Sequence, residues 1–419
     1  MFEQYKLKNY ARVILVPQEN THSVTVMVVF PVGSRHETAK LNGVSHYIEH
    51  LMFKGTKKRK NTLILTREID RLGADYNAFT SKDHTAYHIK TDCKYIETTL
   101  DILSDMLFHS TFDAREMERE KTVIVEELRM YKDNPLMHID TVLEEVLFAG
   151  CPLGRDIGGS EKTVLAFRRP EALAFKARHY NPSNMTIVVA GEINPAVRRL
   201  VDKYFGREHR HRRVSGSFKA AAFGSEKKEA RIAVQRKNTT QVQMRLGFPG
   251  FSYQARVNPA VTVMNLILGG SMSSRLFIQI RERRGLAYSV GSGAENFADT
   301  GYVYIGAGLE AKNINRAIAV IAQEIEKMAD LGVTKRELAD AKTSIRGRMT
   351  LAMEDSRARA SWYAHQSLFA DKLKTPEEKL KVIEAVSARE VKDLVGKIFA
   401  MDKMRVAIIG DVQASDIKY

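Results

Sequence analysis

The chain repeats itself at an interval of 218 to 219 residues, and this repeat limits the possible folds more than any other feature. Residues 20–31 read NTHSVTVMVVFP and residues 238–249 read NTTQVQMRLGFP, two strand-like segments that both end in Phe-Pro. Residues 185–193 read MTIVVAGEI and residues 404–412 read MRVAIIGDV. Matched segments at the start and end of each half indicate a duplicated domain of about 200 residues.

We therefore predict an N-terminal domain over 1–208, a linker over 209–228 and a homologous C-terminal domain over 229–419. The linker is polar and basic, and it shows little hydrophobic periodicity. Its densest charge run, HRHRR over 209–213, is interpreted as solvated chain, because no regular element would hold these side chains in place as a metal or nucleic-acid site.

Hydrophobic periodicity predicts the elements of the first half. Strands are expected over 12–17, 24–30, 76–80 and 85–90. Helices are expected over 44–54, 62–72, 95–107 and 114–131, and the first of them is expected to stop at Gly55. Helices packed on a mostly antiparallel or mixed sheet form an α+β fold, which we expect in both domains.

The segment HYIEHLMFKGT over 46–56 has the spacing of a metal site. His46 and His50 share one face of a helix, so both rings can reach one ion. Glu49 lies to the side, where it can take a proton from a metal-bound water. An amphipathic helix with exposed or hydrogen-bonded histidines gives the same pattern, so the motif alone leaves both interpretations open.

The repeat provides an internal comparison for this motif. A shift of 218 residues places Met264, Ile267 and Leu268 where the first half has its two histidines and its glutamate. The second copy of the helix is apolar at these positions. The fold therefore does not require the polar residues of the first copy, which favours a functional role for them.

The acidic segment EMEREKTVIVEEL over 116–128 is where we expect a third ligand. Glu120 and Glu127 lie two helical turns apart on one stripe. Carboxylates beside an apolar surface are costly when unpaired, and a cation would pair them. We predict that Glu127 is the ligand and that Glu120 orients His50 or another ligand, with a solvated charged face as the alternative.

Taken together, these segments resemble the pitrilysin family of inverted-motif (H-x-x-E-H) zinc peptidases, in the branch of mitochondrial processing peptidase and its bacterial relatives. The resemblance rests on HYIEHLMFKGT, GADYNAFTSKDHTAY (73–87), EREKTVIVEEL (118–128) and LGGSMSSRLFIQIRERRGLAYSV (268–290). It covers the whole chain, including the duplication. It implies a zinc-dependent metalloendopeptidase, a hydrolase of peptides with one Zn2+ per chain.

The resemblance also implies roles for single residues of the metal centre. The zinc ligands would be His46, His50 and Glu127. Glu49 would be the general base, and Glu120 would support the ligands from behind.

Five further residues are implied to contact the substrate. Asn77, Ala78 and Phe79 would lie on an edge strand to which an extended peptide adds as one more strand. Arg281 and Tyr288 would grip the peptide backbone and stabilise the oxyanion. From residue type alone, the first three would form a plain strand and the last two would be surface or packing groups.

Members of this family enclose peptides in a clamshell of four such domains. One chain supplies two domains, so the resemblance implies a homodimer with composite sites, each taking zinc from one chain and Arg281 and Tyr288 from the other. The alternative is a non-catalytic partner or structural subunit, although such members typically lose H-x-x-E-H residues. Whether the substrates are presequences, signal fragments or general peptides stays open, and the ligand set also suits manganese or cobalt.

The composition is that of a globular protein, with 44% hydrophobic and 27% charged residues. The net charge of +15 is spread along helical segments, and no nucleic-acid motif accompanies it, so we expect no nucleic-acid partner. No apolar run is long enough to span a membrane. Two cysteines at no metal-like spacing and the lack of a signal pattern lead us to expect a cytoplasmic location.

Overall fold

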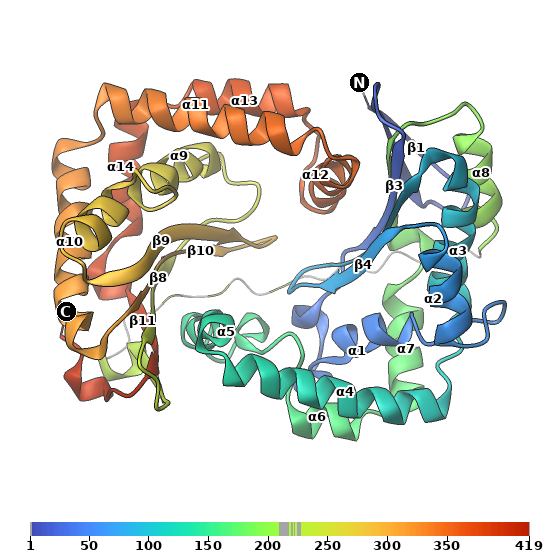
Figure 1. The fold of residues 1–419 in the computed structure, drawn as a ribbon, viewed down its shortest axis with the longest axis horizontal. Helices are drawn as coiled ribbons and strands as arrows, with labels where there is room; N and C mark the ends of the chain where they lie inside the picture. Colours follow the sequence, from blue (N-terminus) through green and yellow to red (C-terminus); the bar gives the residue numbers. More distant parts are fainter. Residues whose placement is uncertain (1, 209–217, 219–220, 222, 224–227, 419) are drawn as a thin grey trace. The chain divides into compact units, whose positions relative to one another are not determined.

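The computed structural model describes residues 2–208, 218, 221, 223 and 228–418, which belong to two compact units (Figure 1). Unit 1 comprises Met1–Leu128, Arg155–Ser217 and Thr350–Thr375. Unit 2 comprises Arg129–Gly154, Phe218–Met349 and Pro376–Tyr419. The basic run predicted to be solvated linker, 209–213, lies outside the described residues.

Unit 1 is built on a six-stranded mixed sheet with the order β1-β2-β6-β3-β5-β4. Its strands are β1 (Glu3–Lys6), β2 (Arg12–Pro17), β3 (Ser23–Phe30), β4 (Asp75–Thr80), β5 (Thr85–Asp92) and β6 (Thr186–Gly191). The pair β2 and β6 is parallel, and the other neighbours are antiparallel. Strands β1 and β4 are therefore the two edges of this sheet.

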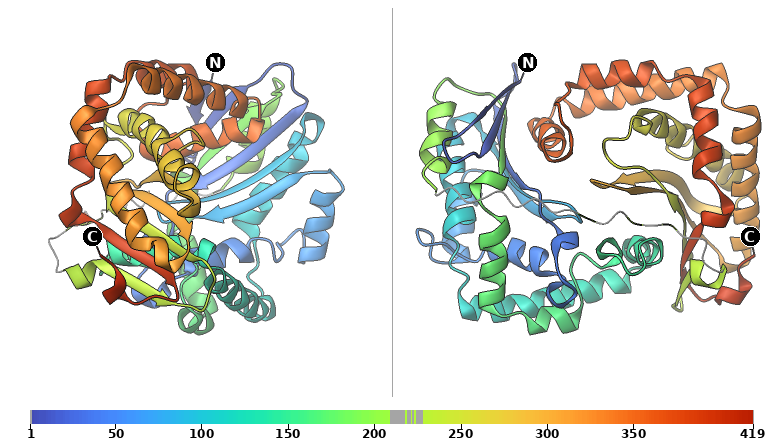
Figure 2. Two further views of the ribbon diagram at one scale, coloured as in Figure 1. Left: turned by 60° about the vertical axis from the view of Figure 1, so that its left-hand side comes forward. Right: turned by 180° about the vertical axis from the view of Figure 1, so that it is seen from behind.

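Helices cover both faces of this sheet. They are α1 (Val44–Leu51), α2 (Thr62–Asp70), α3 (Ile96–His109), α4 (Ala114–Asp133), α6 (Glu161–Ala166), α7 (Arg169–His179), α8 (Val197–Phe205) and α12 (Ser356–Phe369). Alternate side chains of β3 point to opposite faces: Val26 and Val28 enter the core formed with α1 and α3, whereas Met27 and Val29 pack under α12. The views from both sides show α12 beside the sheet (Figure 2).

Unit 2 is built on a five-stranded sheet with the order β7-β11-β8-β10-β9. Its strands are β7 (Ile232–Arg236), β8 (Val242–Pro249), β9 (Ala287–Asn296), β10 (Gly301–Leu309) and β11 (Arg405–Gly410). Its helices are α5 (Pro135–Leu147), α9 (Asn258–Leu268), the π-helix η7 (Phe277–Glu282), α10 (Ile314–Leu331), α11 (Lys335–Ala352), α13 (Pro376–Glu384) and α14 (Ala388–Ile398). Strands β7 and β11 are parallel, and the remaining pairs are antiparallel.

The two sheets repeat one topology. Apart from the additional edge strand β1, the order β2-β6-β3-β5-β4 of unit 1 matches β7-β11-β8-β10-β9 of unit 2, with the parallel pair in the same place. Helix α9 occupies the position of α1 in the repeat. Its Met264, Ile267 and Leu268 are buried, as an apolar copy of the motif requires. The expected α+β fold with two related sheets is confirmed.

Each compact unit also contains a helix from the other half of the sequence. Helix α5 of the first half packs on β8 and β11, and α12 of the second half packs on β3 and β6. The compact units therefore differ from the predicted division into 1–208 and 229–419 by two exchanged segments. Periodicity identifies an amphipathic helix but does not say which sheet its apolar face covers.

The local predictions hold, with helix ends shifted by one to three residues. Strand β2 has the predicted bounds, and the other three predicted strands of the first half lie within β3, β4 and β5. Helix α1 ends at Leu51, whereas the sequence predicted an end near Gly55. Gly55 has φ +124° and a Cβ there would lie 2.8 Å from the Lys60 carbonyl oxygen, so it serves the following turn.

Across the described part of the chain, no helix combines the length and the apolar character that a membrane crossing requires.

Candidate metal centre and substrate-contact residues

The helix that carries the histidines is fixed by its apolar side. Val44, Tyr47, Ile48 and Leu51 of α1 are fully buried in the core of unit 1. The Tyr47 hydroxyl also donates a hydrogen bond of 2.8 Å to the Met117 carbonyl oxygen of α4. Because these residues anchor one side of α1, the two histidines and Glu49 occupy the remaining side together.

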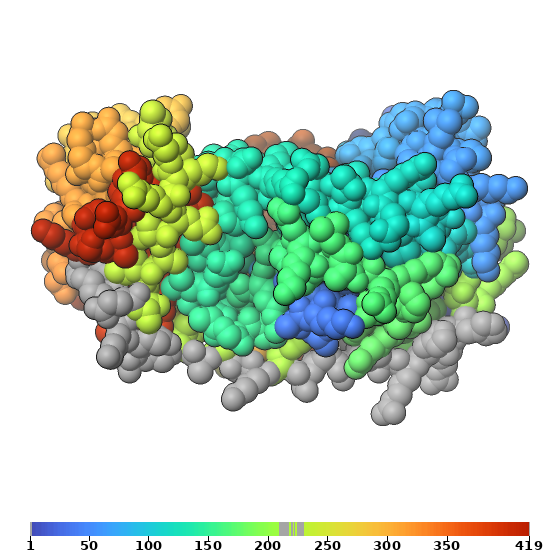
Figure 3. Space-filling view, turned by 90° about the horizontal axis from the view of Figure 1, so that it is seen from below, coloured from blue at the N-terminus to red at the C-terminus, as the bar shows by residue number. Residues whose placement is uncertain are grey.

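Helix α4 is held by its own apolar stripe. Met117, Ile124 and Leu128 are buried, while the opposite face is open to solvent, as the space-filling view of the teal helix shows (Figure 3). The outer face carries Glu118 and Glu126, which are exposed. Glu120 and Glu127, which were predicted to share one stripe, both point inward and reach α1.

His46, His50 and Glu127 form the one group of metal-ligand type found among the described residues. The two Nε2 atoms lie 3.2 Å apart, and they lie 3.7 and 3.4 Å from Glu127 Oε2. Zinc bonds of about 2.0–2.2 Å in a tetrahedral arrangement place ligand atoms about 3.4 Å apart. Glu127 Oε2 is buried without a well-aligned hydrogen bond from the described residues. The donor set and its geometry fit a zinc ion.

Glu120 contacts the second histidine from the side away from the cluster. Its Oε1 lies 2.8 Å from His50 Nδ1, and its Oε2 lies 2.6 Å from the ammonium group of Lys54. A proton on Nδ1 leaves Nε2 free to bind a metal. Glu120 therefore lies on the Nδ1 side of His50, and its role in orienting a ligand stays a prediction. Lys54 as its second partner was not predicted.

The electrostatics of the cluster favour positive charge at its centre. Burial and the neighbouring His50 lower the pKa of His46 to about 4. Burial also acts to lower the pKa of His50, but the carboxylates of Glu120 and Glu127 outweigh it and raise that pKa to about 9. The contact with His50 in turn lowers the pKa of Glu127. Carboxylates that stabilise an imidazolium here would stabilise a metal cation in the same way.

Glu49 points toward the edge strand of the sheet. Its Oε2 accepts a hydrogen bond from the Thr80 hydroxyl at the end of β4. Burial raises the pKa of Glu49, while the bond from Thr80 acts in the opposite direction. A carboxylate with a raised pKa is a better proton acceptor near neutral pH than an ordinary one. Thr80 was missed from the sequence, although it directly follows Phe79.

The predicted substrate strand is an edge of the sheet. Asn77, Ala78 and Phe79 belong to β4, which pairs only with β5 among the described strands. Ala78 is buried on the side that holds the core, whereas Asn77 and Phe79 (41% exposed) point to the other side. An edge strand can accept a further strand through its backbone groups, which is what strand addition by a peptide needs, although the Ala78 N–H donates to Asn77 Oδ1 at 2.9 Å here.

Arg281 and Tyr288 lie together in unit 2. The guanidinium carbon of Arg281 is 5.3 Å from the centre of the Tyr288 ring, a cation–π distance. Arg281 belongs to the π-helix η7, a rare element that often accompanies functional residues. Tyr288, near the start of β9, is 71% exposed. Both side chains are therefore presented at the surface of this unit.

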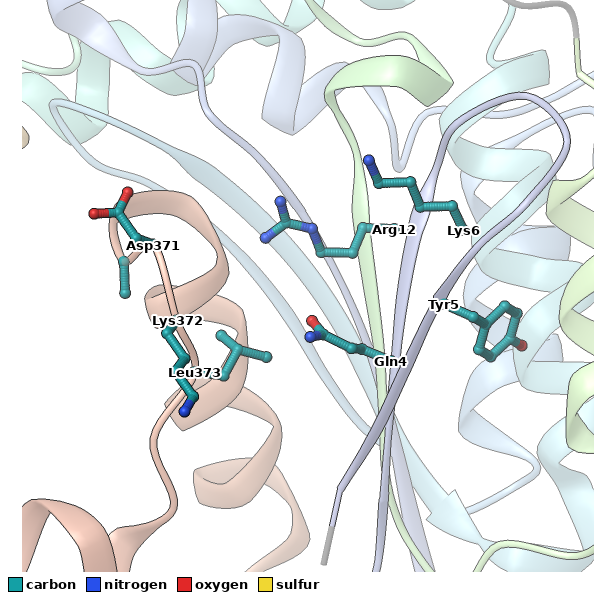
Figure 4. Close-up of a pocket in the computed structure, with 8 residues that line it drawn as sticks. Gln4, Tyr5, Lys6, Arg12, Asp371, Lys372 and Leu373 are labelled. Carbon is teal, nitrogen blue, oxygen red and sulfur yellow. The ribbon is translucent and has the colours of Figure 1, made fainter.

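A separate hollow of about 380 Å³ lies at the opposite edge of the unit 1 sheet. Gln4, Lys6 and Arg12 extend into it from β1 and β2, and Asp371 and the residues after it border it beyond α12 (Figure 4). Because β1 and β4 are opposite edges, this hollow is not part of the metal cluster.

Comparison with known families identifies both halves of the chain. The sequence model of insulinase (Peptidase family M16) matches residues 12–161, which contain the metal cluster. The model of the Peptidase M16 inactive domain matches residues 166–345. The second match agrees with a repeat that has lost the histidine motif.

Curated relatives cover nearly the full length. A Bacillus subtilis protein named "Uncharacterized zinc protease YmxG" is 34% identical over 404 residues, 96% of this chain and 97% of that one. An "Uncharacterized zinc protease" of Rickettsia bellii is 29% identical over 98% of this chain and 97% of that one.

Among solved structures, a protease from Helicobacter pylori superposes with a TM-score of 0.90 at 23% identity, covering 98% of this chain and 99% of that one. At this identity the likeness shows the fold.

Proposed function

Because the chain belongs to peptidase family M16, we propose that it is a zinc-dependent endopeptidase that hydrolyses extended peptides. The observation that carries this proposal is the cluster of His46, His50 and Glu127, whose three ligand atoms have zinc-like spacing. Glu49 stands beside it with its carboxylate bound to the end of the edge strand. The ligands, the base and the strand would then meet in one place.

The roles of the residues follow from their chemistry. When bound, Zn2+ supplies Lewis-acid chemistry that lowers the pKa of a water and polarises a carbonyl. Glu49 accepts the proton of the attacking water and later donates it to the leaving amine. Glu120 keeps Nε2 of His50 directed at the metal. Backbone bonds to β4 would hold the peptide without reading its sequence.

We further propose a homodimeric clamshell with composite sites. Arg281 and Tyr288 of one chain would grip the peptide held at the metal centre of the other and stabilise the oxyanion. Their adjacency and exposure in unit 2 support this role. Presequence-like segments are one substrate class that this arrangement would accept. A cytoplasmic location stays a prediction.

The rival proposal is a non-catalytic subunit of the same family. The intact ligand set and the position of Glu49 favour the enzyme, since a structural subunit has no use for a base beside a metal centre. The two proposals differ in metal content. An enzyme purifies with, or can be loaded to, one zinc per chain, whereas a structural subunit has no stoichiometric zinc.

A peptide library of varied sequence tests the proposed activity over many substrates at once. The zinc-loaded full chain and the chelator-treated chain are incubated with the library, and products are identified by mass spectrometry. We expect internal cleavages that need zinc and return when zinc is restored. A zinc-loaded protein that cleaves nothing, or cleavage that survives chelation, would overturn the proposal.

A further inference from the structure

A buried carboxylate lies beneath the start of α1. Glu37, which is 4% exposed, accepts hydrogen bonds of 2.7 Å from the backbone N–H groups of both Gly43 and Ser45. The N-cap of this helix is Gly43, which has no side chain to satisfy the free N–H groups of the first turn. Glu37 replaces the missing cap from six residues upstream.

The charge of Glu37 is balanced by these donors and by the helix. Glu37 forms no ion pair within the described part of the chain, although burial raises its pKa to about 7. The positive end of the α1 dipole faces the carboxylate, which is the favourable orientation. A carboxylate buried without a cation is costly, so its place at this helix end calls for a specific reason.

The same carboxylate joins α1 to the loop over residues 155–159. The side-chain amide of Asn42 donates to Glu37 Oε2 at 3.1 Å and to the Asp156 carbonyl oxygen at 2.9 Å. The Arg155 guanidinium donates to the Glu37 carbonyl oxygen at 3.1 Å. Helix start and loop are therefore tied at two points.

This loop packs against the first metal ligand. A Cβ built on Gly158 would lie 3.7 Å from His46 Nδ1, so the loop backbone runs near the imidazole with room for about one atom between them. Gly43 is also close to this loop, since a Cβ there would lie 2.4 Å from the Gly158 carbonyl oxygen. The start of α1 is thus in close contact with the loop, and the same loop runs near the ring of His46.

We propose that Glu37 is a positioning residue of the metal centre. It fixes the start of α1 and the adjoining loop, and so sets where His46 and His50 direct their Nε2 atoms. The inference rests on the proposed function, because it takes these histidines to be zinc ligands. Glu37 itself touches neither metal nor substrate and forms no hydrogen bond to β4, so its loss affects metal affinity and kcat and leaves KM unchanged.

The test compares zinc affinity in two matched variants of the full chain. Glu37→Gln keeps the size of the side chain but places an amide NH₂ group next to the N–H groups that donate to the carboxylate in the wild type. Glu324→Gln changes a carboxylate that is also buried (5% exposed), in unit 2, where it pairs with Lys327 at 2.7 Å. Competition with a chromophoric chelator measures Zn2+ binding. We expect zinc affinity at least about 10-fold weaker in E37Q and unchanged in E324Q.

Three further readouts separate positioning from general stability. At saturating zinc, E37Q should lower kcat on a cleaved library peptide with KM unchanged. Asn42→Ala removes the hydrogen bonds from Asn42 to Glu37 and Asp156 but leaves the buried carboxylate. It should therefore weaken zinc affinity less than E37Q does. If E37Q does not fold, this variant tests the positioning role. Glu37→Asp, which keeps the charge, should recover part of the affinity.

The outcomes distinguish the two claims. If the wild-type chain itself binds no zinc, the proposed function fails. If the wild type binds zinc and E37Q and N42A bind it equally well, the positioning role alone is overturned. A loss of affinity as large in E324Q as in E37Q would likewise overturn it.

Discussion

At the residue scale, the candidate metal centre contains two side-chain pairs that join separate elements. Glu120 Oε1 lies 2.8 Å from His50 Nδ1, and the Thr80 hydroxyl donates a hydrogen bond to Glu49 Oε2. Glu120 and Glu127 of α4 contact His50, whereas the nearby Glu118 and Glu126 are exposed. Helical spacing places the two groups of glutamates on different faces of α4, and only the inward face reaches α1.

Glu127→Gln tests the third ligand against an adjacent control. The amide is a poor zinc ligand, so the variant should bind zinc at least about 100-fold more weakly than wild type, while Glu126→Gln, on the exposed face, should bind it normally. Chelator competition measures both. Equal affinity of the two variants would remove Glu127 from the ligand set.

A second residue-scale prediction concerns acid stability. His84 is partly buried and packs against His365, and desolvation followed by the effect of the second imidazole lowers its pKa to about 3. The unfolded chain, with a histidine pKa near 6.5, binds more protons below that pH, so stability present above pH 6.5 is lost as the pH falls toward 3. At pH 5 this loss amounts to at most about 2 kcal/mol.

His84→Gln removes this titration and keeps a polar group near Ser81. Urea unfolding at pH 7 and pH 5 should show a smaller drop in unfolding free energy than in wild type. His22→Gln is the control, because the His22 side chain is 98% exposed and should behave like wild type. An H84Q drop equal to that of wild type would contradict the assignment.

At the scale of elements, the eight residues of α1 carry both histidines and the base, so the geometry of its ends matters. Gly43 starts the helix at φ +96° and has no room for a side chain. Gly73 also has a positive φ, +62°, but faces open space. Substitutions at the two glycines can therefore separate the cost of backbone strain from the cost of steric contact.

Gly43→Ala should cost more than about 2 kcal/mol of unfolding free energy and weaken zinc binding, since both strain and contact oppose it. Gly73→Ala should cost only about 1 kcal/mol, the strain of the left-handed conformation. Urea unfolding and chelator competition measure these effects. A G43A variant that binds zinc as tightly as G73A would show that the helix start does not control the site.

The elements also show how far sequence reasoning reaches. The period-four spacing of His46 and His50 and the stripe through Glu120 and Glu127 are local patterns, so they were readable before the fold was known. The contacts of Thr80 and Lys54 join separate elements and leave no periodic signal. The packing of α5 and α12 in the unit of the other half could not be predicted either, because an apolar helix face does not indicate which sheet it covers.

At the scale of the whole molecule, the candidate ligands lie in one half of the repeat and have apolar counterparts in the other. Both sheets have one strand order, and α9 buries apolar residues where α1 presents ligands. In the proposed dimer, the second half contributes Arg281 and Tyr288 to the site of the partner.

Complementation between two variants tests the composite sites. Glu49→Gln and Arg281→Ala chains should each be nearly inactive alone. After subunit exchange, mixed dimers contain one intact site, so statistical mixing at equal amounts should restore about one quarter of wild-type activity. Gel filtration with light scattering confirms the dimer. No recovery in mixtures with proven exchange, or full activity in a monomer, would contradict composite sites.

The central claim is that Glu49 acts as the base beside a zinc ion held by His46, His50 and Glu127. Its most direct test is the kcat of zinc-loaded Glu49→Gln on a cleaved peptide, with zinc content determined by atomic absorption. The account predicts one zinc per chain and a kcat at least about 100-fold below wild type. Cleavage at the wild-type rate by zinc-loaded E49Q would contradict it.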